Sequence, residues 1–222
     1  MGKKREPVIT IDGPSGAGKS TVSRLLAEKL SYMYLDTGAL YRALAYKVIK
    51  EGLPPGDARL SELCARTKIC LEEREGGLRV VIDGEDVTEK IRTEEIGLLA
   101  SKVSGIPAVR KALLSLQREA GAEGGIVAEG RDMGTVVFPD ADFKFYLDAE
   151  VGERARRRYS ELVMKGMAAD YGEVEKDIVL RDRQDHERSI SPLKVPEGAV
   201  IIDSSRVTVN DVVAKIMEIV RC

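Results

Sequence analysis

The sequence predicts an α/β fold: a five-stranded parallel sheet covered by helices, with a small antiparallel β insert. Short apolar runs recur along the chain, and most are separated by segments in which apolar residues recur at helical spacing. A glycine-rich loop joins the first apolar run to the first helical segment, within 25 residues. Alternating strands and helices favour a parallel sheet with helices on both faces.

The predicted strands are short apolar runs of the kind found in buried parallel sheets. They cover residues 8–12, 34–36, 125–128, 143–147 and 199–203. The predicted helices cover residues 19–30, 38–51, 107–121, 150–165, 171–188 and 208–221. Residues 67–90 break this alternation, because two β-like runs follow each other directly, joined through Glu75-Gly76-Gly77 and followed by an Asp83-Gly84 turn. We expect this region to form the antiparallel insert.

Composition narrows the class of protein. The chain has 222 residues, 43% of them hydrophobic, which suits one domain, and a net charge of −2 argues against coating nucleic acid or anionic membrane. No run of 18 apolar residues and no secretory signal occurs. The cysteines, Cys64, Cys70 and Cys222, lack metal-binding spacing, so we expect reduced thiols in a cytoplasmic protein.

The loop Gly13-Pro14-Ser15-Gly16-Ala17-Gly18-Lys19-Ser20 fits the pattern G-x-x-x-x-G-K-[ST]. Glycines let successive backbone N–H groups point inward and cradle a phosphate at a helix N-terminus. Lys19 supplies a point charge for the β and γ phosphates, and the Ser20 hydroxyl is the predicted ligand of Mg²⁺. This loop, extended to Thr21, predicts binding of Mg-ATP in a P-loop NTPase fold.

The loop alone does not say what is done with the nucleotide. An Asn-Lys-x-Asp segment that would read guanine is absent, and so is an LSGGQ segment of ABC-type ATPases. Asp148, at the end of a predicted strand, has two interpretations: a carboxylate that organises the metal, or a cap of the next helix.

Three arginines, two at strand-to-helix turns and one at a helix end, indicate which kind of group accepts the phosphoryl group. Arg42, Arg131 and Arg188 are expected near the carboxyl ends of the strands, where open parallel sheets bind ligands. A hydroxyl acceptor needs a protein base to remove its proton. A phosphate monoester is mostly a dianion already, and it needs arginines that bind it through two hydrogen bonds each. The pattern therefore favours a phosphate acceptor; surface ion pairing is the alternative.

A second basic group lies in the segment Glu153 to Arg158. Arg154, Arg157 and Arg158 share one helical face, which is typical of a lid that closes over ATP phosphates. A solvated basic face is the alternative. With the lid closed, we expect four cations to stabilise the reacting phosphates: Lys19, Arg131, Arg158 and Arg188.

Four motifs, in order between residues 7 and 220, give the chain a family resemblance. Ile-Asp-Gly-Pro-Ser-Gly-Ala-Gly-Lys, the 35–42 turn Leu-Asp-Thr-Gly-Ala-Leu-Tyr-Arg, the 130–139 segment Gly-Arg-Asp-Met-Gly-Thr-Val-Val-Phe-Pro, and the Arg181…Asp185…Arg188…Pro192-Leu193 pattern resemble bacterial-type cytidylate kinase. The resemblance implies transfer of a phosphoryl group from ATP to CMP or dCMP. It also implies one kinase domain over 1–222, with an NMP-binding region at about 37–122 that contains the insert, and a LID at about 150–170.

The resemblance also assigns roles to single residues. It implies that Thr37, Arg42, Arg131 and Arg188 bind the acceptor phosphate, that Ser101, Arg110 and Asp132 read cytosine, and that Arg181 and Asp185 meet the sugar. Arg154 and Arg157 would bind ATP together with the P-loop. Thr37 stands where many members have Ser, which keeps the hydroxyl. Ser20 stands where some members have Gly, which adds a hydroxyl.

Two other functions stay open from the residues. One is a P-loop kinase for another small acceptor, such as UMP, AMP or a hydroxyl acid; the other is a nucleotide-binding switch without transfer activity. We expect a monomer whose partner is a small molecule, with neither nucleic acid nor membrane involved.

Overall fold

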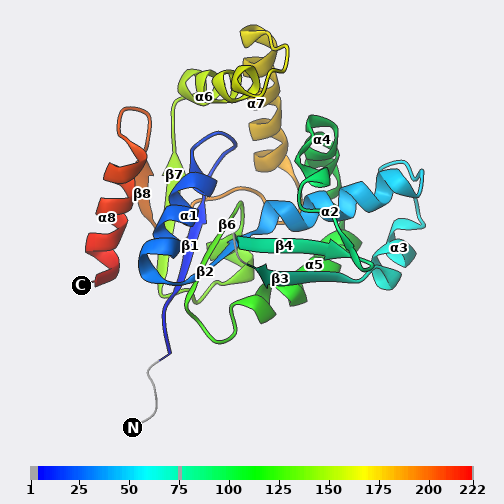
Figure 1. Cartoon of the computed structure of the whole chain (residues 1–222), viewed down its shortest axis with the longest axis horizontal. Helices are drawn as coiled ribbons and strands as arrows, with labels where there is room; N and C mark the ends of the chain where they lie inside the picture. Colours follow the sequence, from blue (N-terminus) through cyan, green and yellow to red (C-terminus); the bar gives the residue numbers. More distant parts are fainter. Residues whose placement is uncertain (1–4, 75–76, 222) are drawn as a thin grey trace.

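Five strands form one parallel sheet in the order β2-β6-β1-β7-β8 (Figure 1). The computed structural model describes residues 5–74 and 77–221, so Cys222 lies outside the described residues. The strands are β1 (Val8–Asp12), β2 (Met33–Asp36), β6 (Ile126–Gly130), β7 (Phe143–Asp148) and β8 (Val200–Asp203). All four pairings between neighbours are parallel, which confirms the predicted fold class.

The helices connect and cover these strands. They are α1 (Lys19–Leu30), α2 (Thr37–Lys50), α3 (Leu60–Arg66), α4 (Glu94–Val103), α5 (Pro107–Ala120), α6 (Val151–Met164), α7 (Tyr171–Glu187) and α8 (Val209–Arg221), with the short turns η1 (Lys90–Arg92) and η2 (Met133–Val137). The six predicted helices are present with ends that agree within one residue, whereas α3 and α4 were not predicted. Among the helices of the described chain, none has the length and apolar character needed to cross a membrane.

The insert is an antiparallel sheet of three strands, β3 (Ile69–Arg74), β4 (Gly77–Ile82) and β5 (Glu85–Asp86). Its register pairs Ile69 with Ile82. Asp83 and Gly84 have φ angles of +50° and +84°, as a tight hairpin turn requires, so the predicted turn leads into the short β5. The antiparallel insert is confirmed; Glu75 and Gly76 of its predicted first turn lie outside the described residues.

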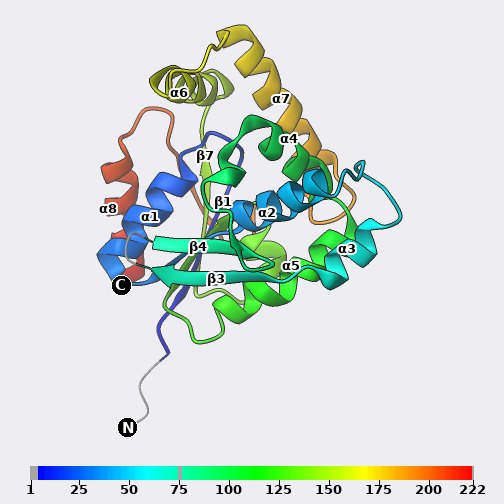
Figure 2. The ribbon, with the colours of Figure 1, turned by 45° about the vertical axis from the view of Figure 1, so that its right-hand side comes forward.

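The sheet separates two hydrophobic cores. Side chains of α1 and α8 pack against one face, and those of α2, α4, α5 and the insert pack against the other (Figures 1 and 2). A smaller apolar cluster joins α6 to α7, which lie beyond the carboxyl ends of the strands. The loop before α1, the turn before α2 and the turn after β6 therefore meet beneath α6 and α7.

Candidate active site

The loop between β1 and α1 turns at three glycines. Gly13, Gly16 and Gly18 have φ angles of +150°, +78° and +91°, which residues with a side chain rarely adopt. A Cβ on Gly13 would lie 2.0 Å from the carbonyl oxygen of Leu147 in β7. Gly18 is the N-cap of α1, so no side chain caps the N–H groups at the start of this helix, where an anion binds most favourably.

Lys19 is the buried cation of this loop. Its side chain is folded back, and Nζ donates a hydrogen bond of 2.7 Å to the carbonyl oxygen of Pro14. Burial, and repulsion from Arg131, lower the pKa of Lys19 to about 7, although Glu129 favours its charged form. A polyphosphate on the loop would offer Lys19 a stronger acceptor than a carbonyl and would favour its charged form.

A buried carboxylate, Glu129, faces the start of α1 from the end of β6. It accepts a hydrogen bond of 2.5 Å from the Tyr34 hydroxyl. Its backbone carbonyl accepts one of 2.7 Å from Thr37 Oγ1. Burial raises the pKa of Glu129, and the Ser20 hydroxyl is near enough to oppose that rise. A hydroxyl and a carboxylate thus lie together beside the P-loop, a donor set that fits Mg²⁺ held mainly by nucleotide phosphates and water.

Two arginines share one carboxylate at the end of β2. Asp36 Oδ2 lies 3.1 Å from Arg42 Nη2 and 3.1 Å from Arg92 Nη1. Asp36 also caps α2, because its Oδ1 accepts from the Ala39 N–H at 3.0 Å. Burial alone would raise the pKa of Asp36, but the two arginines hold it below its usual value. Arg92 was not predicted to belong to the site.

A second arginine group surrounds Asp185. Arg131 Nε donates to Asp185 Oδ2 at 2.7 Å, and Arg188 Nη1 lies 3.8 Å from Asp185 Oδ1. Arg181 lies close by, and burial together with repulsion from Arg131 lowers its pKa to about 10. Three guanidinium groups around one carboxylate make this region suited to a dianion.

A buried ion pair joins Arg110 of α5 to Asp132, which follows β6. These residues are 8% and 2% exposed, and the Arg110 guanidinium lies over the Tyr41 ring, 5.6 Å from its centroid. Burial raises the pKa of Asp132, against the pull of Arg110 and Arg188. Within the described chain, the buried Ser101 hydroxyl has no hydrogen-bond partner. The structure therefore brings Ser101, Arg110 and Asp132 to the same part of the site as Arg188.

Arginines of α6 connect this helix to the P-loop, to α7 and to α4. Arg154 Nη1 donates to the Ser15 carbonyl of the P-loop at 3.1 Å, and its Nη2 lies 2.7 Å from Asp182 in α7. Arg158 pairs with Glu94 at the start of α4. A solvated basic face therefore does not describe Arg154 or Arg158, whose guanidinium groups bridge different segments.

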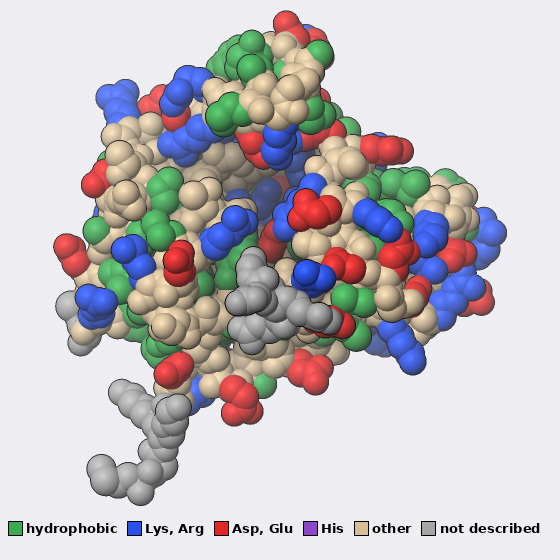
Figure 3. Space-filling model, in the orientation of Figure 1, with side chains coloured by type: hydrophobic (Ala, Val, Ile, Leu, Met, Phe, Trp, Pro, Cys, Tyr) green, Lys and Arg blue, Asp and Glu red, His purple; other side chains and the backbone are tan. Residues whose placement is uncertain are grey.

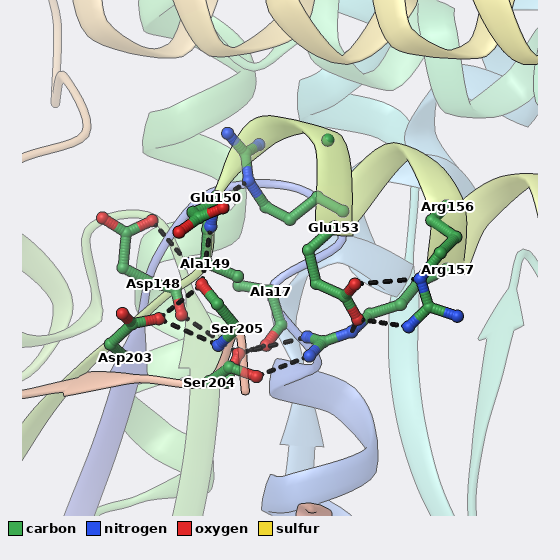
Figure 4. A network of polar contacts seen from close by, with 12 residues as sticks. Ala17, Asp148, Ala149, Glu150, Glu153, Arg156, Arg157, Asp203, Ser204 and Ser205 are labelled. Atoms are coloured by element: carbon green, nitrogen blue, oxygen red, sulfur yellow. Dashed lines mark hydrogen bonds and ion pairs between the residues drawn. The ribbon is translucent and has the colours of Figure 1, made fainter. Parts of the chain in front are cut away.

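Arg157 takes part in a polar network beside the P-loop (Figure 4). Its Nη1 donates to Ser204 Oγ at 3.1 Å, while Ser204 Oγ is 3.0 Å from both the Ala17 and the Asp148 carbonyl oxygens. The Asp148 carboxylate accepts from the Ala149 N–H at 2.8 Å, just before α6. The interpretation of Asp148 as a helix cap is wrong, because the N-cap residue of α6 is Glu150 and, in the described chain, no side chain caps the start of this helix. Glu129 is the carboxylate that faces the loop.

A cavity and a basic hollow both adjoin the P-loop. A cavity of about 220 Å³ adjoins the P-loop and is lined by Ala17, Gly18, Val22, Arg157, Ser204, Val207, Thr208, Val209 and Val212. On the face drawn in Figure 3, Lys and Arg side chains gather around a hollow below α6 and α7. The P-loop thus has a cavity with mixed polar and apolar lining on one side and the arginine-rich region on the other.

Comparison with known proteins decides the family. The sequence profile described as cytidylate kinase matches residues 9–222. The chain belongs to the cytidylate kinase family. A cytidylate kinase of Geobacter sp. strain M21 is 50% identical over 206 residues, which are 92% of this chain and 88% of that protein. One from Coxiella burnetii is 47% identical over 222 residues, 99% of this chain and 94% of that protein. The resemblance drawn from the four motifs is confirmed.

Solved structures support the fold. A shikimate kinase from Bacteroides thetaiotaomicron aligns with a TM-score of 0.51 at 15% identity, covering 97% of this chain and 99% of that one. An uncharacterized protein from Eubacterium ventriosum aligns with a TM-score of 0.54 at 10% identity, covering 97% and 99%. At such identities, the likeness of this cytidylate kinase family member to both structures concerns the fold alone.

Some residues of the site were not found by sequence reasoning. Asp36 lies inside a quoted motif and Glu129 directly before one, both in the last residues of a strand, so their position at the carboxyl edge of the sheet was an available signal. No such signal exists for Arg92 and Ser104, because their partners come from other segments of the chain. Tyr41 lies inside a quoted motif, but its contact with Arg110 of α5 could not be read from it.

Proposed function

We propose that this protein transfers the terminal phosphoryl group of ATP to CMP or dCMP, giving ADP and CDP or dCDP. The observation that carries the proposal is the turn after β6, in a chain of the cytidylate kinase family. There Arg131 points to the Asp185 group and the next residue, Asp132, pairs with Arg110. One turn thus supplies a cation for a phosphate and a carboxylate for a base.

Arg42, Arg131 and Arg188, with Thr37, hold the acceptor phosphate. The three arginines contact Asp36 or Asp185, and a phosphate dianion is a stronger acceptor that competes with these carboxylates. Because the acceptor is already a dianion, no protein base has to remove a proton from it.

Asp132, with Arg110 and Ser101, selects the base. A carboxylate accepts a hydrogen bond from the exocyclic amine of cytosine, while Arg and Ser satisfy the ring acceptors. Uracil offers a carbonyl oxygen to the same carboxylate, and two acceptors repel each other. Arg181 and Asp185 contact the sugar.

The P-loop from Gly13 to Thr21, with Arg154 and Arg157, binds ATP, and Ser20 is the protein ligand of Mg²⁺. The Glu129 carboxylate lies near the Ser20 hydroxyl. When bound, the metal offsets negative charge on the phosphates. Lys19 and the arginines Arg131, Arg158 and Arg188 stabilise the charge of the phosphoryl group during its transfer, under a LID of residues 150–170 that closes towards the NMP-binding region of residues 37–122. The enzyme acts as a monomer in cytoplasmic pyrimidine nucleotide metabolism.

A coupled assay of ADP release tests the proposal across CMP, dCMP, UMP, AMP, GMP and shikimate. CMP and dCMP should give the highest kcat/KM. Preference for shikimate would indicate a kinase for a hydroxyl acid, and preference for AMP, GMP or UMP would indicate another base specificity. ATP binding without ADP release for any acceptor would indicate a nucleotide-binding switch.

A further inference from the structure

Ser104, at the end of α4, touches both ends of the acceptor site. It is 7% exposed and is the C-cap residue of its helix. Its carbonyl oxygen accepts from Arg110 Nη1 at 3.2 Å, and its hydroxyl accepts from Arg188 Nη1 at 3.3 Å. One residue therefore contacts the arginine placed at the base and an arginine placed at the phosphate.

The hydroxyl proton of Ser104 is already used. Ser104 Oγ donates to the Ser101 carbonyl oxygen at 2.8 Å, in the last turn of the same helix. A serine hydroxyl has one donor and two lone pairs, so this bond turns the lone pairs away from Ser101. The hydroxyl is thereby fixed as an acceptor for Arg188.

The orientation of Arg188 follows from its contacts. Nε donates to the Ser191 carbonyl at 2.6 Å and Nη1 to Ser104 Oγ, while the buried Nη2 has no hydrogen-bond partner in the described part of the chain. A guanidinium group is planar and rigid, so holding two of its nitrogens fixes the third. A buried donor without a partner is costly unless a ligand supplies an acceptor.

We propose that Ser104 is a positioning residue for the acceptor nucleotide, which acts through Arg188 with its hydroxyl and through Arg110 with its carbonyl. This inference rests on the proposed function. Because the carbonyl belongs to the backbone, a change of the side chain separates the two effects. Removal of the hydroxyl releases Arg188 Nη1 and the backbone carbonyl of Ser101, and it leaves the bond from Arg110 and the Ser101 side chain in place. The hydroxyl therefore affects binding of the phosphate and not the choice of base.

The test is calorimetric titration of CMP and UMP into the whole enzyme without ATP, for wild type and Ser104→Ala. A lost hydrogen bond to a charged donor raises a dissociation constant by about tenfold. We expect this increase for CMP and for UMP alike, so the CMP/UMP ratio stays within about twofold. The KM for ATP should stay unchanged, because Ser104 has no contact with the P-loop among the described residues.

Thr67→Val is the matched control. Thr67 is the C-cap of α3, and its hydroxyl donates to the Leu63 carbonyl at 2.7 Å, as Ser104 does to Ser101, but no arginine donates to it in the described chain. The control should lose a similar amount of thermal stability and keep wild-type affinity for CMP. In an Arg188→Met background, Ser104→Ala should change CMP affinity by less than about twofold, since the residue through which it acts is gone.

The outcomes separate the two proposals. Wild-type enzyme that does not bind CMP would overturn the proposed function and the inference with it. Wild-type enzyme that binds CMP, together with unchanged affinity in Ser104→Ala, would overturn the inference alone. A full effect that persists without Arg188, a changed CMP/UMP ratio, or an equal loss of ATP affinity would also contradict it, because each requires Ser104 to act by another route.

Discussion

At the scale of single residues, the acceptor site consists of arginines that already hold carboxylates. Arg131 and Asp185 pair across 54 residues of sequence, and Arg110 pairs with Asp132 across 22. Removing one partner of a buried pair leaves the other charge unpaired, which costs more than the pair contributes. Substitutions at these positions therefore need readouts that distinguish substrate choice from stability.

Asp132→Ala should narrow the preference for CMP over UMP. The carboxylate favours the cytosine amine and repels the uracil carbonyl, so its loss should reduce kcat/KM for CMP at least about tenfold more than for UMP. Asp86→Ala, which removes an exposed insert carboxylate that pairs with Arg79, is the control and should leave the ratio unchanged. If both nucleotides lose activity by the same factor in Asp132→Ala, the residue orients its neighbours and does not read the base.

Asp12 connects the end of β1 to the turn that carries Asp132. Its two carboxylate oxygens accept from the N–H groups of Met133 at 2.7 Å and Gly134 at 2.8 Å. Burial nevertheless raises its pKa to about 6 from an ordinary value of 3.8, with Asp132 adding to the effect and Lys19 opposing it. The folded protein therefore binds a proton at Asp12 more readily than the unfolded chain does.

This pKa gives stability a pH dependence with a definite sign. A carboxyl with a raised folded pKa favours folding most below about pH 4, and this contribution is lost as the pH rises to about 6. The free energy of unfolding of wild type, minus that of Asp12→Asn, should fall by about 3 kcal/mol over this window and level off above it. Urea denaturation of both proteins from pH 4 to 8 measures it; a difference independent of pH would refute the assignment.

At the scale of elements, the sequence predicted the core strands and the P-loop because their signals are local. Buried strands are continuous apolar runs, and the loop is one contiguous motif. α3 was missed because seven residues hold barely two helical turns. α4 was missed although Ile96, Ala100 and Val103 recur at helical spacing, since it starts directly after the insert and depends on packing in the core shared with α2.

In the site, too, local features were predicted and long-range contacts were not. The P-loop residues could be predicted from their motif, whereas the partners of the arginines can be identified only in the folded structure. Nothing local marks Ser104, a serine at a helix end, as a contact of both Arg110 and Arg188. Glu129 directly precedes a quoted motif, yet its position beside Ser20 depends on β6 lying next to β1 in the sheet.

Gly13→Ala should show how closely β1, the P-loop and β7 pack. The added Cβ would meet the Leu147 carbonyl oxygen at 2.0 Å in a backbone conformation that alanine disfavours. We expect a loss of about 4 kcal/mol in the free energy of unfolding without nucleotide. Gly56→Ala is the matched control, because Gly56 also has positive φ (+91°) but nothing within 4 Å of its Cβ, and should lose about 1 kcal/mol. Equal losses in urea denaturation would show that the loop has room to adjust.

At the scale of the whole molecule, the sheet places two binding regions at one edge. The cavity beside the P-loop lies on the side of α1 and α8. The arginines that contact Asp36 and Asp185 lie on the side of α2 and α4. α6 contacts the P-loop through Arg154 and α4 through Arg158, and α7 carries Asp185, which pairs with Arg131. This arrangement suits a donor and an acceptor that must meet with water excluded.

The acceptor group of this enzyme is the phosphate of a cytosine nucleotide. ³¹P NMR of the enzyme with Mg-ATP and either CMP or cytidine tests this assignment directly, because the products differ in their phosphorus signals. With CMP, the two coupled signals of CDP should grow as ADP forms, and cytidine, which has no phosphate for the arginines to hold, should remain unchanged. Conversion of cytidine to CMP, or release of ADP and inorganic phosphate without CDP, would contradict the account.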